Sequence, residues 1–229
     1  MTTSGALADE GAGYEVVEGE QPELLGRNLM SAAHLLASAT AFFFRAFLFA
    51  YLYLRALNNG GMWKPKGVDA SVGWGTGIAV CIVASAVLVR LGYEDHKADR
   101  RAAWRIKGAA ALVVGLVALV LQVVAWKQQG FGPSDGGFAS VYFGWTAFML
   151  LFVLLTLIWL ETVLAMSIRY RKIPSGAPDP GHASGDRYRS AHDIRDPLSL
   201  VRAELRALSF YWLFLAGIAV LSWVVLYLL

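Results

Sequence analysis

Four long segments of this 229-residue chain contain no Asp, Glu, Lys or Arg: residues 70–89, 108–126, 136–160 and 207–229. Each is about as long as the ~20 residues that an α-helix needs to cross ~30 Å of hydrocarbon. Segment 28–54 is equally long, and Arg45 is its only Asp, Glu, Lys or Arg. With 57% hydrophobic residues and a mean hydropathy of +0.51, the chain is too apolar for an ordinary soluble domain. We therefore expect an all-α, polytopic membrane bundle of five transmembrane helices.

The polar residues between these segments set the expected boundaries. We expect one membrane domain, 27–229, with spans at about 28–57, 71–92, 107–127, 138–168 and 207–229. The acidic residues 1–26 have no signal-peptide pattern and are expected to form a disordered tail. Residues 169–196 are rich in Pro, Gly, Ser and charge, which is typical of a flexible loop.

Residues Asp196 and Pro197 are the types that favour a helix N-cap and first turn. Apolar residues at helical spacing then predict an amphipathic start to the last span, namely Leu198, Val201, Leu205 and Leu208. This start would contact a partner or lipid, or would pack on its own neighbours. Glycines such as Gly73, Gly75 and Gly77, or Gly108 and Gly115, are expected to permit close helix approach.

Basic residues are distributed unequally between the two sets of loops. One side carries 15, namely Arg27, Arg90, Lys97, Arg100, Arg101, Arg105, Lys107, Arg169, Arg171, Lys172, Arg187, Arg189, Arg195, Arg202 and Arg206. The other side carries four, namely Arg55, Lys64, Lys66 and Lys127. By the positive-inside rule, we expect the N-terminus in the cytoplasm, the C-terminus outside and loop 169–196 in the cytoplasm. This basic charge flanks membrane spans, so it does not indicate nucleic-acid binding.

Four ionisable or carboxamide side chains fall well inside the expected spans: His34, Arg45, Gln122 and Glu161. Intramembrane polar residues are costly, and they commonly mark a functional site. At ~1.5 Å per residue, Arg45 and Gln122 lie about 6–7 Å to the outer side of the midplane, and Glu161 and His34 about 10 Å to the cytoplasmic side. We therefore expect two polar pairs, Arg45 with Gln122 and His34 with Glu161.

Three of these residues, Arg45, His34 and Glu161, have more than one interpretation. The long Arg45 stem could carry its guanidinium to the outer headgroups. Contact with a partner subunit or backbone carbonyls, and pairing inside the chain, are the alternatives. His34 is also typical of a hydrogen-bonded packing residue, and Glu161 of a solvated or salt-bridged one.

The chain lacks the residues for a haem or metal site of its own. Its only cysteine is Cys81, and of four histidines only His34 lies within a span. A membrane haem generally needs two axial ligands at matching depth, and a metal centre needs three or four ligands. No hydrolase triad, HExxH motif or phosphate-binding loop occurs either. These residues predict a non-catalytic membrane subunit without an active site.

Several stretches resemble subunit III of the haem-copper (cytochrome c) oxidases. They are "LLASATAFFFRAFLFAYLYLR" followed by "MWKP", then "VLQVVAW", "VYFGWTAFMLLFVLL" and "FYWLFLAGIAVLSWVVLYLL". The matching positions are Ser38, Phe43, Trp63, Pro65, Gln122, Trp126, Thr146, Phe148, Val153, Tyr211, Trp212 and Phe214. The family's ionisable positions are replaced, at Ala39, Ala125, Met149, Phe152, Leu213 and Ala216. A five-span chain resembles bacterial members that lack the family's first two helices.

The resemblance implies an accessory subunit of a respiratory terminal oxidase in a bacterial plasma membrane. Such a subunit packs against the catalytic subunit and other oxidase subunits, which hold the haem and copper, and it binds phospholipid. Candidate lipid or partner contacts are Arg45, Gln122, Trp126, Tyr211 and Trp212. The missing ionisable groups weaken the family's link to proton uptake.

Two other functions stay open. One is the subunit III-like protein associated with nitric oxide reductases, which shares the helical pattern. The other is a small transporter or channel lined by Arg45, Gln122, Glu161 and His34. Transport would favour broken helices or an inverted repeat, and the sequence displays neither.

Overall fold

The computed structural model describes residues 22–58, 60–169 and 197–229, and within these ranges the regular structure is entirely helical. The helices are α1 (Pro22–Ala56), α2 (Val72–Lys97), α3 (Arg101–Gln128), α4 (Gly137–Arg169) and α5 (Pro197–Trp223), and α5 continues as a π-helix over Val224–Leu228. Five helices, α1 to α5, are long and apolar enough to cross a membrane. The predicted five-helix bundle is therefore confirmed, while residues 1–21 and 170–196 of the expected tail and loop lie outside the described part.

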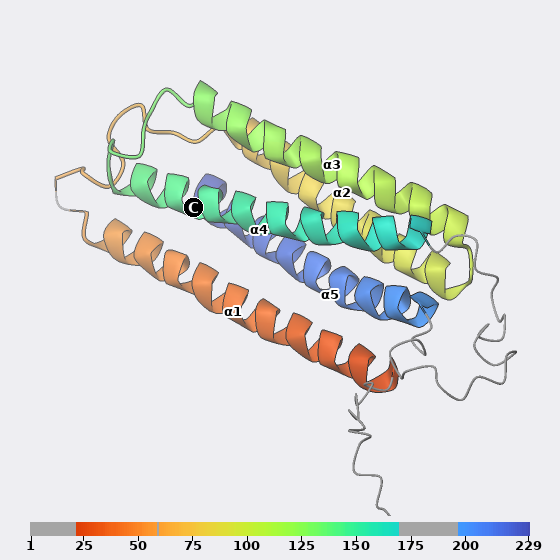
Figure 1. The fold of residues 1–229 in the computed structure, drawn as a ribbon. Helices are drawn as coiled ribbons and strands as arrows, with labels where there is room; N and C mark the ends of the chain where they lie inside the picture. Colours follow the sequence, from red (N-terminus) through yellow and green to blue (C-terminus); the bar gives the residue numbers. More distant parts are fainter. Residues whose placement is uncertain (1–21, 59, 170–196) are drawn as a thin grey trace, which may run out of the picture.

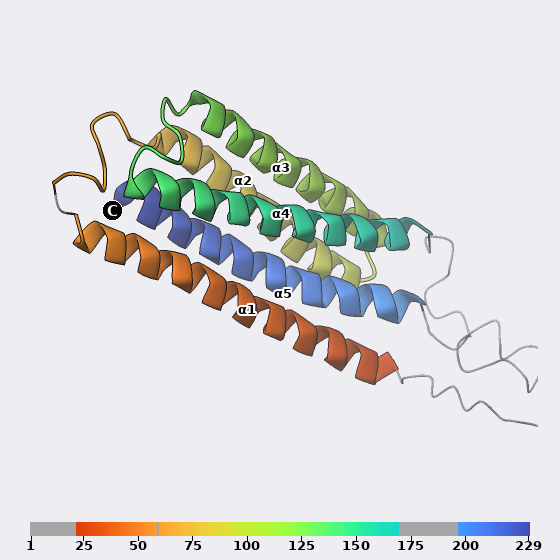
Figure 2. The same ribbon diagram turned by 60° about the vertical axis from the view of Figure 1, so that its left-hand side comes forward.

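The five helices run side by side, with α1 at one edge (Figures 1 and 2). Helix α5 is the most enclosed: 44% of its most apolar window is buried, against 22% for α1. It packs against α1, α2 and α4, while α3 packs against α2 and α4. Helix α1 is therefore the least covered element of the bundle.

The two ends of the bundle differ in chemistry. One end, here named the aromatic end, holds the α1–α2 and α3–α4 loops and the C-terminus, and its buried rings include Tyr51, Trp63, Phe138 and Tyr142. The other, the basic end, holds the short α2–α3 loop and is rich in Arg and Lys. This difference matches the charge bias that underlies the orientation we expect.

Helix boundaries extend beyond the predicted spans. Helix α1 starts at Pro22, so residues 22–26 belong to it and not to the expected tail. Helices α2 and α3 leave only Ala98–Arg100 between them, where a longer loop was expected, and Asp99 turns the chain with φ 59°. Charged residues mark the end of a hydrocarbon span but need not end the helix. The turns that extend beyond the membrane can be stabilised by ion pairs and by water around their charged side chains.

Helix α5 begins at Pro197, as the sequence predicted. Its first apolar turns pack within the bundle: Val201, Leu205 and Leu208 are at most 1% exposed. Of the two interpretations of this segment, packing on the chain's own neighbours is therefore correct for these three side chains.

Close helix approach occurs at some of the predicted glycines and not at others. A Cβ at Gly115 would collide with the Leu157 side chain of α4, and one at Gly108 would lie 3.3 Å from Leu164 Cδ1, also on α4. By contrast, a Cβ at Gly77 would meet nothing within 4 Å. The prediction fails at Gly77, since that helix face has no close neighbour.

Candidate functional site

Helix α1 presents an apolar face that the described chain leaves uncovered. Phe42 is 72% exposed and Phe49 68% exposed, whereas Phe44 and Tyr51 on the opposite face are each 2% exposed. We define the α1 outer face by its exposed side chains, Leu35, Phe42, Arg45, Phe49, Leu52 and Tyr53. A lipid-facing helix tolerates such exposure, but this face also carries a charge.

Arg45 lies on the α1 outer face between Phe42 and Phe49 in sequence, and it is exposed. It forms no hydrogen bond or ion pair with residues in the described ranges. The predicted pairing of Arg45 with Gln122 is wrong, because Gln122 is buried on α3 and α1 packs against α4 and α5. Similar depth in the membrane did not imply neighbouring helices.

The second predicted pair, His34 with Glu161, is also not formed. His34 donates from Nδ1 to the Met30 carbonyl at 2.7 Å, and its ring lies 4.5 Å from that of Phe210 on α5. Glu161 is exposed on α4, and no hydrogen bond or ion pair joins it to His34 in the described structure. His34 is thus a hydrogen-bonded packing residue, which was the other interpretation of its position.

A polar cluster occupies the interior near the aromatic end, and we name it the tyrosine–glutamine cluster: Gln122, Gln129, Tyr142 and Tyr227. Gln129 Nε2 donates to the Tyr142 hydroxyl at 2.7 Å, and the Tyr142 and Tyr227 hydroxyls are 3.0 Å apart. Gln122 lines the same small cavity as Tyr227. Helices α3 and α4 and the π-helical turn that ends α5 meet here, so these contacts tie the three segments together.

Both glutamines of this cluster are only 6% exposed, and each retains one buried carboxamide atom without a partner among the described residues. These atoms are Gln122 Nε2 and Gln129 Oε1. A buried amide atom without a hydrogen bond is costly, so each of these two atoms needs a further hydrogen-bonding partner. The burial of Gln122 also bears on its predicted role. Gln122 is therefore not a lipid or partner contact, contrary to its sequence assignment.

Tryptophan indoles link the helices through a set of bonds that sequence analysis missed. Six of the eight tryptophans donate Nε1–H to a side chain on a different helix. The bonded pairs are Trp104–Ser167, Trp126–Thr146, Trp145–Ser222, Trp159–Glu204, Trp212–Ser85 and Trp223–Thr76, at 2.8–3.1 Å. The available signal was the presence of Ser and Thr in otherwise apolar spans, where a polar group needs a partner.

Three predicted contact residues take part in these internal contacts. Trp212 is 1% exposed and Tyr211 2% exposed, with the Tyr211 hydroxyl 3.1 Å from Thr40 Oγ1. Their expected role as lipid or partner contacts is wrong, because their side chains are enclosed by this chain's own helices. Trp126 is half-buried and donates to Thr146, so its outward contact stays a prediction.

Aromatic side chains fill the contact between α1 and α4. The Phe43 ring lies 4.6 Å from that of Phe148 and 5.6 Å from that of Phe152, measured between centroids. Phe44 meets Trp145 at 6.1 Å on the same contact. The Phe-rich stretch of α1 therefore has two functions, since one side packs inward and the other forms the α1 outer face.

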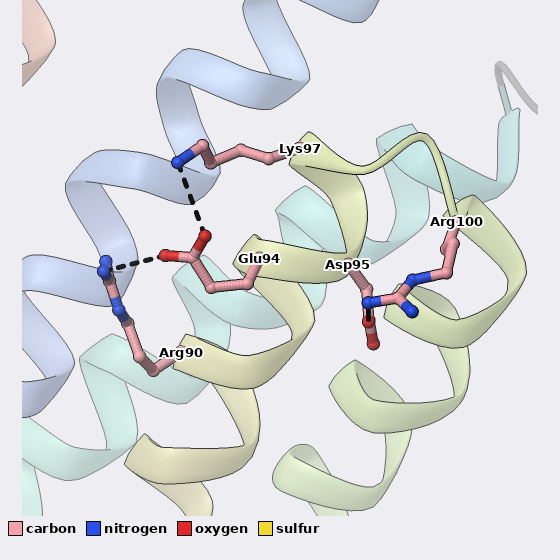
Figure 3. A network of polar contacts seen from close by, with 5 residues as sticks. All are labelled: Arg90, Glu94, Asp95, Lys97 and Arg100. Carbon is pink, nitrogen blue, oxygen red and sulfur yellow. Dashed lines mark ion pairs between the residues drawn. The ribbon is translucent and has the colours of Figure 1, made fainter.

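Ion pairs surround the carboxylates at the basic end (Figure 3). Glu94 pairs with Arg90 at 2.8 Å and with Lys97 at 3.4 Å. Asp95, only 4% exposed, pairs with Arg100 at 2.7 Å and with Lys107 at 2.5 Å. The Asp95 carboxylate thus joins the end of α2 to the start of α3 across the short loop.

In the described ranges, no three His, Cys, Asp or Glu side chains are grouped so that they could hold a metal ion. The placement of haem and copper in partner subunits stays a prediction. No family model matches the chain, and no curated protein sequence matches it. The fold thus defines a class, a multi-pass helical protein with five apolar helices suited to a membrane.

Proposed function

We propose that this chain is a non-catalytic accessory subunit of a respiratory haem-copper terminal oxidase in a bacterial plasma membrane. It is similar to subunit III, stabilises the catalytic subunit and binds phospholipid. Haem and copper belong to the partner subunits. The observation that carries the proposal is the α1 outer face, which combines exposed aromatic rings with an arginine that has no partner among the described residues.

An unpaired charge on a lipid-facing helix is costly, on the order of 2.5–3.5 kcal/mol on insertion scales. In an α-helix the Cα–Cβ bond tilts toward the N-terminus. Arg45 lies about 15 Å along the axis from Arg55 but about 27 Å from Arg27, so the nearer interface is at the C-terminal end of α1. The Arg45 stem therefore leans away from the nearer headgroups, which favours a protein partner over snorkelling.

Contacts between the motif residues support the resemblance to subunit III. Phe43 packs on Phe148, and Trp126 donates to Thr146, so residues from separate matching stretches meet in space. In the accessory-subunit account, these contacts maintain the shape of the bundle while the α1 outer face binds the catalytic subunit. Chemistry at the haem then belongs to the partner.

The test is affinity purification of the full chain from its native membranes in a mild detergent, followed by mass spectrometry and an optical spectrum. A haem-copper oxidase catalytic subunit with a haem spectrum is expected in the same fraction. A nitric oxide reductase subunit instead would identify the related alternative. A stable, colourless homo-oligomer would contradict the proposal.

A further inference from the structure

Two small cavities meet at Gln122 in the interior of the bundle. The larger, about 30 Å³, lies among α2, α3, α4 and α5, and its polar lining includes Thr146, Ser222 and Tyr227. The smaller, about 10 Å³, lies among α2, α3 and α4. The two share four lining residues: Ile78, Ile82, Gln122 and Met149. The Gln122 side chain thus faces both spaces.

The Gln122 carboxamide requires a hydrogen-bond acceptor at this position. The residue is only 6% exposed, so its Nε2 is shielded from solvent, yet this atom makes no hydrogen bond to the described residues. Nearby hydroxyls already have partners: Thr146 donates to the Tyr142 carbonyl and accepts from Trp126, and Ser222 donates to the Ile218 carbonyl and accepts from Trp145. Each oxygen retains one lone pair, which can accept from a small molecule that also accepts from Gln122.

We propose that the larger cavity is a binding site for one or two water molecules, held by Gln122 Nε2. A cavity needs roughly 10–15 Å³ for each water and two to four polar partners, so 30 Å³ with this lining is sufficient. The water accepts from Gln122 and donates to the oxygens of Thr146 or Ser222. The Gln122 carboxamide thereby gains a hydrogen bond without bonding directly to a side chain of another helix.

Tyr227 borders a second, larger space at the aromatic end. Tyr227 lines this cavity and also lines a pocket of about 330 Å³ at the aromatic end, together with Tyr51, Arg55 and Lys64. Its hydroxyl is held by Tyr142 at 3.0 Å. Tyr227, together with Leu226, therefore lies between this pocket and the hydrated site.

Hydroxyl radicals generated from bound water by an X-ray pulse provide a direct test, because they oxidise methionine sulfur nearby. Met149 lines both cavities but is only 7% exposed, while Met166 on the same helix lines neither. In the purified full-length chain, Met149 is expected to be oxidised despite its burial. An unoxidised Met149 would overturn the proposal, because it would mean that the cavity is dry.

The role of Gln122 is tested with substitutions that remove its amide. Gln122→Leu and the unbranched Gln122→Met are both expected to abolish oxidation at Met149 and to leave Met166 unchanged. Gln128→Leu, which removes an exposed amide from the same helix, is the matched control and should leave both sites unchanged. Oxidation of Met149 that persists in a folded Gln122→Met variant would contradict the assignment. The outcome does not depend on the proposed oxidase partner.

Discussion

Trp212 on α5 donates its indole N–H to Ser85 Oγ on α2 at 3.1 Å, and Ser85 in turn donates to the Ala111 carbonyl on α3 at 2.7 Å. Three helices are thereby joined through one hydroxyl in the interior, where Ser85 is fully buried. Interhelical hydrogen bonds of this kind contribute on average about 0.6 kcal/mol in membrane proteins, with a maximum near 1.7 kcal/mol.

We expect Ser85→Ala and Trp212→Phe to be coupled. Each variant should lower the free energy of unfolding in detergent, and the double-mutant cycle should give a coupling of about 0.6 to 1.7 kcal/mol. Trp126→Phe breaks a bond elsewhere, to Thr146, and combined with Ser85→Ala it serves as the additive control. A Ser85–Trp212 cycle that is additive within error would show that this bond contributes no net stability.

Glycine packing gives a matched pair of substitutions. Gly115→Ala should destabilise the bundle by roughly 1–3 kcal/mol, because the added Cβ would displace the buried Leu157 side chain. Gly77→Ala has open space and should be neutral or stabilising by up to about 1 kcal/mol through helix propensity. Thermal unfolding of both variants measures the difference, and equal destabilisation would contradict the α3–α4 contact described above.

The two adjacent carboxylates of α2 differ in burial, although each pairs with two cations. We expect Asp95→Asn to lower the unfolding midpoint more than Glu94→Gln does, because Asp95 is enclosed and joins two helices. Glu94 is 43% exposed at its side chain, and such pairs are typically worth about 0–1 kcal/mol. The measurement is the unfolding midpoint of both variants in low and high salt, because salt screens an exposed ion pair more than an enclosed one. A larger loss for Glu94→Gln would be inconsistent with this arrangement.

Hydropathy alone predicted the number of spanning helices and the apolar central part of each. It did not predict which helices are neighbours, because depth along the membrane contains no information on the angle around the bundle. Arg45 and Gln122 were assigned similar depth, yet α1 packs against α4 and α5 while α3 packs against α2 and α4. The resemblance likewise suggested Tyr211 and Trp212 as outward contacts, although both are interior.

Other features of the site depend on pairs that are remote in sequence. The Tyr142–Tyr227 contact joins residues 85 positions apart, and Trp212–Ser85 spans 127. A single sequence shows each residue type but not the partner. The sequence also does not show that Arg45 is exposed, because this depends on which face of α1 packs against α4 and α5.

Arg45 should matter for assembly and not for the stability of the isolated chain. Because it is exposed and unpaired within the described ranges, Arg45→Leu should change the free energy of unfolding of the purified chain by less than about 0.5 kcal/mol. The yield of the proposed oxidase complex should fall, while activity per assembled complex is kept. Val120→Leu, on a 62% exposed site of α3, is the control. Activity falling to zero in a fully assembled Arg45→Leu complex would refute this prediction.

The central claim is that the α1 outer face binds a partner subunit, and site-specific photo-crosslinking in native membranes tests it most directly. A photoreactive residue at Phe49 on α1, 68% exposed, is compared with one at Val113 on α3, 60% exposed. The account predicts a crosslink from position 49 to a haem-copper oxidase catalytic subunit and none from position 113. Crosslinks from position 49 only to lipid or to a second copy of this chain would contradict it.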